Sequence, residues 1–198
     1  MVELRNIFGG FGNRLFQLAY IYAQVREGNL PDIYLQDFKH FEKYKEEVKS
    51  LFAQGSYPRS ESIAIHIRRG DYQKTNFYVD LTKTDYYDKA IAMFPNQHFL
   101  LFCADRQPIS DDVEDKEWCM EFLSKKGVEY SVWNSDDEIK DFNAMAACKG
   151  IICANSSFSA WAAFVNQNPD KKIVAPKEYY SDGIERTVLP KNEGWIFI

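Results

Sequence analysis

Short apolar stretches alternate with longer stretches of helical periodicity along most of this chain. The apolar stretches predict strands at about residues 63–67, 99–104, 128–133, 151–154 and 172–175. The intervening stretches predict helices at about residues 84–94, 117–126, 137–149 and 160–165. Strands that alternate with helices of about ten residues predict βαβ units and a parallel sheet. The pattern therefore predicts an α/β protein with a Rossmann-type parallel sheet and helices on both faces.

The first sixty residues depart from this alternation. A glycine-dense turn, containing Gly10 and Gly12, precedes a helix predicted over about residues 14–26, and a second helical stretch covers about residues 38–52. We expect two parts in consequence. Residues 1–60 would form a reduced amino-terminal βα half, and residues 61–198 a Rossmann-like half with a carboxy-terminal tail.

The isoleucine-rich strand ends in polar and charged side chains. Its period of two places Ile63, Ile65 and Ile67 on one face, and His66 and Arg68 on the other. In open α/β sheets the carboxyl ends of the strands hold ligands. The guanidinium group matches a phosphate bidentately, so an arginine at this edge favours a phosphate or diphosphate ligand. We expect Arg68 to bind a phosphate and His66 to hydrogen-bond the same ligand.

The neighbouring arginine leaves an alternative open. Arg69 points to the opposite face and is expected to be structural. Arg68 and Arg69 beside Asp71 could also form no more than a structural ion-pair turn, although that interpretation leaves His66 without a role.

A second candidate anion site follows the strand at residues 151–154. Asn155, Ser156 and Ser157 join this strand to the next helix, and Asn and Ser are preferred N-cap residues. The amino terminus of a helix also binds anions, through its free N–H groups and its dipole. The two interpretations are compatible. The glycines before the first helix are a weaker signal, because they lack GxGxxG spacing and a P-loop lysine, but they permit close backbone approach to a ligand.

Composition narrows the classes of function. The formal net charge of −5 over 198 residues argues against a nucleic-acid partner, which requires a basic face. No apolar run approaches the roughly 18 residues of a membrane span. The four cysteines lack CxxC spacing, which favours buried, reduced thiols, and no Cys/His spacing suggests a metal site. We therefore expect a cytoplasmic protein with no membrane span and no metal.

Three segments, in the same order along the chain, resemble motifs of the α-1,2-fucosyltransferase family. GGFGNRLFQ at residues 9–17 resembles the family's GGLGNQxFQ loop, and HIRRGDY at residues 66–72 resembles its HxRRGDY signature. ANSSFSAW at residues 154–161 is similar to its ANSSFSWW segment. The resemblance implies a GT-B glycosyltransferase, with a GDP-sugar between two Rossmann-like halves and metal-independent inversion at the anomeric carbon.

The resemblance also implies roles for single residues. Arg68 would hold the β-phosphate, His66 would lie near the diphosphate or the nucleoside, and Ser156 and Ser157 would meet the phosphates. Asp141 matches an acidic position that contacts guanine in related fucosyltransferases, and Asn13 would reach the transferring sugar from the opposite half. The remaining candidates for the donor site are Gly10, Gly12, Asp105 at the end of the strand at residues 99–104, and Asn155. Asp71 is the acid nearest in sequence to the phosphate site, where it would take the acceptor proton or orient the loop.

The chain departs from the family in size. Residues 14–67 are all that separate Asn13 from Arg68, whereas the family usually has a much longer segment there. Arg14 also replaces the usual glutamine. We expect transfer of L-fucose from GDP-L-fucose to a glycan hydroxyl, with an α-1,2 linkage and no cofactor. The alternatives are a non-catalytic GDP-sugar-binding module and the same chemistry with another GDP-hexose donor.

Overall fold

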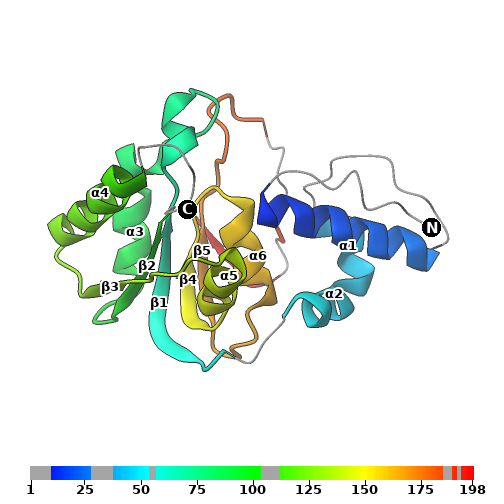
Figure 1. Cartoon of the computed structure of the whole chain (residues 1–198). Helices are drawn as coiled ribbons and strands as arrows, with labels where there is room; N and C mark the ends of the chain where they lie inside the picture. The colour runs from blue at the N-terminus through cyan, green and yellow to red at the C-terminus, as the bar shows by residue number, and fades with distance from the viewer. Residues whose placement is uncertain (1–9, 28–37, 54–56, 104–111, 185–188, 191–192) are drawn as a thin grey trace.

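A six-stranded parallel sheet forms the centre of the molecule (Figure 1). The computed structural model describes residues 10–27, 38–53, 57–103, 112–184, 189–190 and 193–198. The strands are β1 Ser60–Ile67, β2 Phe99–Cys103, β3 Tyr130–Val132, β4 Cys148–Ile152, β5 Lys172–Ala175 and β6 Ile196–Phe197. Their order, β3-β2-β1-β4-β5-β6, is that of the doubly wound Rossmann fold. The predicted Rossmann-type parallel sheet is thus confirmed.

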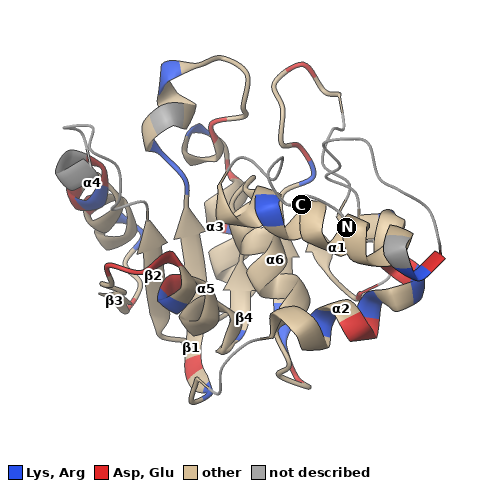
Figure 2. Cartoon of the chain, turned by 45° about the vertical axis from the view of Figure 1, so that its right-hand side comes forward, with Lys and Arg blue, Asp and Glu red and all other residues tan. Residues whose placement is uncertain are grey.

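Helices cover both faces of this sheet. They are α1 Phe11–Glu27, α2 Lys45–Phe52, α3 Tyr86–Ala92, α4 Asp112–Lys125, α5 Glu138–Ala146 and α6 Ser157–Val165, with shorter 3₁₀ helices η2 Phe38–Tyr44, η3 Gly70–Lys74 and η4 Leu81–Lys83. Side chains of α3 and α4 pack with one apolar face of the sheet, and those of α1, α2, α5 and α6 pack on the other side. Figure 2 shows that Lys, Arg, Asp and Glu residues fall mostly in the helices and loops, whereas the strands consist largely of other residues.

The alternation along β1 is the one that its sequence predicts. Ile63, Ile65 and Ile67 are buried in the cluster beneath α3 and α4, whereas Ala64 belongs to the cluster on the opposite face. His66 therefore shares the face of β1 that α5 and α6 cover.

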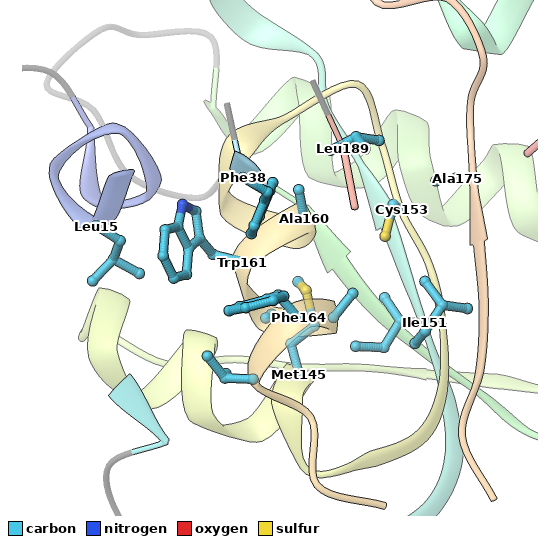
Figure 3. Packing of buried hydrophobic residues seen from close by; sticks show 14 of the residues in the cluster. Leu15, Phe38, Met145, Ile151, Cys153, Ala160, Trp161, Phe164, Ala175 and Leu189 are labelled. Carbon is cyan, nitrogen blue, oxygen red and sulfur yellow. The ribbon is translucent and has the colours of Figure 1, made fainter. Parts of the chain in front are cut away.

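The amino-terminal helices share a hydrophobic core with α6. Trp161 of α6 is fully buried, and its ring lies 5.1 Å from that of Phe16 and 5.2 Å from that of Phe38. The rings of Phe41 and Phe52 lie 5.4 Å away from it. Figure 3 shows Leu15 of α1 and Phe38 on either side of the Trp161 ring. Aromatic side chains dominate core energetics because each buries a large apolar area, so this cluster anchors α1 and α2 on the sheet domain.

Several predicted boundaries were wrong. The helix predicted to reach residue 149 ends at Ala146, because Cys148 already pairs with Ser60 in the sheet and the Ser60 amide donates to the Ala147 carbonyl (3.0 Å). α4 begins at Asp112, before the predicted residue 117, and β3 covers less than the predicted residues 128–133. The helical stretch predicted at residues 38–52 is interrupted, since Phe41 has a non-helical φ of −128°.

The end of the chain adds a strand where a tail was expected. Ile196–Phe197 forms β6, which pairs in parallel with β5. The Ile198 amide donates to the Ala175 carbonyl (3.1 Å), and the Lys177 amide donates to the Ile198 carbonyl (2.9 Å). Two residues are too few to show a period of two, so β6 has no signal in the sequence pattern.

The cysteines are free thiols, as predicted. Cys119, Cys148 and Cys153 are buried, and Cys103 is partly exposed at the end of β2. Across the ranges that the structure describes, no helix has the length and apolar character required to cross a bilayer.

Candidate functional site

Two candidate segments meet at the carboxyl edge of the sheet. β1 and β4 are hydrogen-bonded neighbours, with Ile65 opposite Ile152. The strand order reverses between them, and open α/β sheets bind ligands in the crevice at such a point. His66 and Arg68 lie at the end of β1, and Ser156 lies just after β4. The fold therefore brings both predicted anion-binding segments to one place.

The amino terminus of α6 has the predicted cap. Ser156 is the N-cap residue, and its hydroxyl accepts a hydrogen bond from the Phe158 amide (3.3 Å). The remaining first-turn amides and the helix dipole give this end a partial positive charge. A negatively charged ligand at the crevice would therefore be stabilised by α6.

The amino terminus of α1 reaches the same place. The Ser157 hydroxyl donates to the Asn13 side-chain oxygen (2.7 Å). A Cβ atom at Gly12 would lie 2.5 Å from the Ser157 carbonyl carbon and 2.6 Å from the Phe158 nitrogen. Only glycine permits this approach, so the first turns of two helices abut beside β1 (Figures 1 and 2).

Asn13 occupies a different position from the one its sequence suggests. α1 begins at Phe11, so Asn13 lies inside the first turn rather than before the helix. The resemblance implies that Asn13 reaches the sugar from an opposite half, yet its side chain bonds to Ser157 of the phosphate-side helix. Gly10, the other glycine candidate here, has open space around its Cα, with nothing within 4 Å of a built Cβ.

The imidazole of His66 has a buried nitrogen, Nδ1, that could hydrogen-bond a ligand. Its side chain is 6% exposed, and among the described residues its Nδ1 has no hydrogen-bond partner. The ring lies 5.9 Å from that of Phe158 on α6. Burial, with a smaller contribution from the charge of Arg68, lowers the pKa of His66 to about 3, so the imidazole is neutral at pH 7. Buried polar atoms are normally hydrogen-bonded, and a ligand in the crevice is a suitable partner.

The lowered pKa of His66 predicts a pH dependence of stability. The unfolded chain binds a proton near the ordinary pKa of about 6.5, whereas folded His66 binds one only near 3. The free energy of unfolding should therefore be highest above about pH 6.5. It should fall as the pH drops towards about 3, by up to about 1.4 kcal/mol per pH unit from this residue. The free energy of unfolding, measured with urea at several pH values from 4 to 7, should depend less steeply on pH in His66→Gln than in the wild type. Equal slopes would contradict the buried, neutral imidazole.

Arg68 and Arg69 have the different environments that the strand pattern predicts. The Arg68 guanidinium is half-buried and lies 5.1 Å from the ring of Tyr72. Arg69 donates from Nε to a carboxylate oxygen of Asp115 (2.8 Å) and lies 3.6 Å from the ring of Trp118. Asp115 and Trp118 are on α4, and Arg69 also donates from Nη2 to Oε1 of Gln73 in η3 (2.7 Å). These contacts are of the kind that a structural role for Arg69 requires, and Asp115 is a carboxylate partner that the sequence did not suggest.

Asp141 is held by a residue that the sequence reasoning missed. The Trp133 indole N–H donates to Oδ1 of Asp141 (2.8 Å), across the gap between β3 and α5. The ring of Phe102 stacks on Trp133 at 6.0 Å. Asp141 is therefore a carboxylate oriented by Trp133, rather than a solvated charge. The signal available in the sequence was that Trp133 is the last residue of the strand predicted at residues 128–133.

The Asn155 side chain serves the fold. Its amide nitrogen donates to the carbonyls of Val79 (2.8 Å) and Tyr179 (3.0 Å), which ties together two loops above the sheet. Asp105 lies outside the described residues. Asp71 lies in η3, but its side chain lies outside the description, so its role stays a prediction.

A metal was not expected at this site. Within the described ranges, no three His, Cys, Asp or Glu side chains gather as a metal site would require. Metal independence remains a prediction about the reaction.

The fold is a Rossmann-type parallel α/β fold with candidate anion-binding groups at one edge of its sheet, and comparison with known proteins specifies the family. The model of glycosyl transferase family 11, a fucosyltransferase family, matches residues 10–198, and the chain belongs to this family. The three motifs at residues 9–17, 66–72 and 154–161 indicate the same family.

Two curated relatives from Escherichia coli are similar to the chain. The O-antigen biosynthesis glycosyltransferase WbnK is 31% identical over 131 residues, which cover 62% of this chain and 40% of WbnK. An alpha-1,2-colitosyltransferase is 24% identical over 190 residues, which cover 82% of this chain and 60% of that protein. The matched part is thus less than two thirds of either relative's length. No solved structure matches the chain significantly.

Proposed function

We propose that the chain transfers L-fucose from GDP-L-fucose to a glycan hydroxyl, forming an α-1,2 linkage with inversion and without a metal. One observation carries this proposal. Arg68, the amino terminus of α6 and His66, whose Nδ1 has no hydrogen-bond partner in the described part of the chain, lie at the sheet edge where the strand order reverses. Such an edge suits a diphosphate, because it combines a guanidinium fork with free amides and a helix dipole.

The positive groups at this edge would act when the sugar–phosphate bond of the donor is cleaved. The bond between the anomeric carbon and the β-phosphate oxygen breaks, and its electron pair stays on the phosphate. Arg68 and the α6 amides would stabilise the charge that develops there, in positions arranged before the reaction begins. The acceptor oxygen bonds to the anomeric carbon from the opposite side and loses its proton to a base. Asp71 is our candidate for that base.

Asp141 would supply the preference for guanine. Trp133 orients Asp141 through its bond to Oδ1, and the carboxylate would accept from guanine N–H groups. Uracil and adenine do not present the same pair of donors. GDP should therefore bind better than UDP or ADP.

A thermal-shift series tests the guanine preference. GDP should raise the Tm of the wild type, while UDP and ADP at the same concentration should not, because only a ligand of the folded state stabilises it. Asp141→Asn should keep the bond from Trp133 and turn an N–H group towards guanine, so the Tm increase with GDP should mostly disappear. Asp136→Asn, on an exposed residue of the preceding loop, is the matched control and should respond to GDP as the wild type does. Equal shifts with all three nucleotides would contradict the assignment of Asp141.

Two observations favour alternatives. The relative named alpha-1,2-colitosyltransferase favours another deoxyhexose as the donor sugar. The short segment between Asn13 and Arg68 favours a non-catalytic sugar-nucleotide-binding module.

A single assay separates these possibilities. GDP release from GDP-L-fucose, and from GDP-colitose, would be measured with a panel of galactose-terminated acceptors, and the products identified by mass. Transfer of fucose supports the proposed function, and transfer of colitose alone supports the other donor. A GDP-dependent Tm increase without any transfer identifies a binding module.

A further inference from the structure

Four aromatic side chains form a continuous row that starts at Arg68. Tyr72 lies beneath the Arg68 guanidinium and stacks on Tyr78, with ring centroids 3.8 Å apart and planes 5° apart. Beyond Tyr78 lie the rings of Phe77, at 5.0 Å, and Tyr180, at 5.5 Å. We call Tyr72, Tyr78, Phe77 and Tyr180 the aromatic row.

Hydrogen bonds to backbone groups, as well as ring stacking, hold the aromatic row in place. Tyr78 and Tyr180 form an antiparallel bridge, and the Ser181 amide donates to the Phe77 carbonyl (3.0 Å). The Tyr72 hydroxyl donates to the carbonyl of Asn155 (3.2 Å), the residue before the N-cap of α6. The row is therefore tied to the same edge of the sheet as the phosphate-binding groups.

The far end of the row is exposed. Phe77 is 40% exposed, and it is the one aromatic side chain among the large hydrophobic residues that the described structure exposes to this degree. Phe77 therefore offers an exposed aromatic ring that continues the stacked row from Arg68, and such a ring can contact a ligand.

The geometry points to the outer end of the aromatic row, at Phe77, as the subsite for the sugar ring of the acceptor. This inference rests on the proposed function, because it assumes that a sugar acceptor comes to the Arg68 crevice. It adds a binding site for the acceptor and the chemical class of what binds there: a pyranose ring that presents a C–H face.

The chemistry of a pyranose matches this surface. The face of an aromatic ring carries partial negative charge, whereas the C–H groups on one face of a pyranose are slightly positive and apolar. Stacking on an aromatic face holds such a ring without satisfying its hydroxyls, which stay free to react or to bind water. Stacking of this kind can accept different pyranoses, since it requires a ring face rather than a fixed set of hydrogen bonds.

The position along the row favours the acceptor over the donor sugar. The donor sugar is bonded directly to the β-phosphate, so it must lie next to Arg68. Tyr72 and Tyr78 separate Phe77 from Arg68, which places Phe77 one group further out. The next group outward from the donor sugar is the acceptor.

Ring-specific variants of Phe77 test the subsite. Phe77→Leu keeps an apolar side chain but removes the ring face, and Phe77→Trp enlarges that face. Met120→Ala is the control, because Met120 is 37% exposed on α4, away from the row. The probes are methyl β-D-galactopyranoside and methyl β-D-glucopyranoside, observed by saturation-transfer NMR with GDP present. Transfer from GDP-L-fucose to the galactoside gives KM and kcat separately.

The expected results depend on the ring. Wild type, Phe77→Trp and Met120→Ala should transfer saturation to at least one glycoside, and Phe77→Leu should lose most of that signal. The KM for the galactoside should rise about tenfold in Phe77→Leu, by analogy with bases that stack on aromatic side chains, and kcat should change much less. The Tm increase with GDP should be the same in all four proteins.

Other outcomes separate the subsite from the proposed function. No signal from either glycoside with the wild type, or equal signals from wild type and Phe77→Leu, would overturn the subsite. Ring-dependent glycoside binding without any transfer of fucose would uphold the subsite and overturn the proposed function. Fucose transfer with a KM that does not depend on the ring at position 77 would overturn the subsite and uphold the proposed function.

Discussion

Replacing Arg68 with alanine is expected to lower kcat for sugar transfer by about 10²–10³-fold, the usual loss when one preorganised donor to a developing charge is removed. Arg68 lies at the end of β1, beside the amino terminus of α6, where the leaving phosphate would gain charge. Arg68→Lys should recover little of this loss, because an ammonium group cannot reproduce the bidentate guanidinium fork.

The measurement is GDP release from GDP-L-fucose with the best acceptor, at saturating donor. Arg59→Ala removes an exposed arginine just before β1 and serves as the matched control, with near wild-type kcat expected. Circular dichroism and thermal melts show whether each variant is folded. A folded Arg68→Ala protein with near-normal turnover would refute the phosphate-binding role.

Gly12→Ala is the second substitution with a large expected effect. The added methyl group would lie 2.5 Å from the Ser157 carbonyl carbon, and a backbone atom cannot move aside as a flexible side chain can. Alanine favours an isolated helix over glycine by about 1 kcal/mol. Overpacking costs about 1–3 kcal/mol, so we expect net destabilisation. Separation of α1 from α6 would also displace Asn13 and Ser157, and a shift of about 1 Å near a reacting centre lowers rates about 10²-fold.

Gly10→Ala is the internal control for this prediction. A Cβ atom at Gly10 meets nothing within 4 Å, so this variant should change the free energy of unfolding by no more than about 0.5 kcal/mol. Urea unfolding and transfer rates of both variants are the measurements. If Gly12→Ala is as stable and as active as Gly10→Ala, the close approach of the two helices is not a feature of the active protein.

Patterns among residues close together in the sequence were sufficient to predict much of the fold. The strand predicted at residues 172–175 is β5, and the faces of β1 follow from its period of two. Ser156 was identified as a cap because its hydroxyl bonds to an amide only two residues away. Signals of this kind depend on neighbours in the chain, and a sequence shows its neighbours directly.

Element boundaries and site contacts depended on distant partners. Cys148 has no local reason to leave a helix, and pairing with Ser60 is what makes it part of β4. Trp133 orients Asp141 because β3 ends beside α5, and the spacing of the two residues does not show this. The aromatic row also joins residues 72–78 to residue 180, which lie about a hundred positions apart in the chain.

The sequence by itself determined the family, the parallel α/β architecture and the two strand ends that would carry an anion site. Periodicity and short motifs encode these features, because each rests on residues that are adjacent in the chain. The tertiary structure decided that Asn13 bonds to Ser157 and that Nδ1 of His66 is buried with no hydrogen-bond partner among the residues described. It also placed two stacked tyrosines between Arg68 and the exposed Phe77. These features arise from packing between segments far apart in the chain, where close approach, burial and stacking are set by the whole fold.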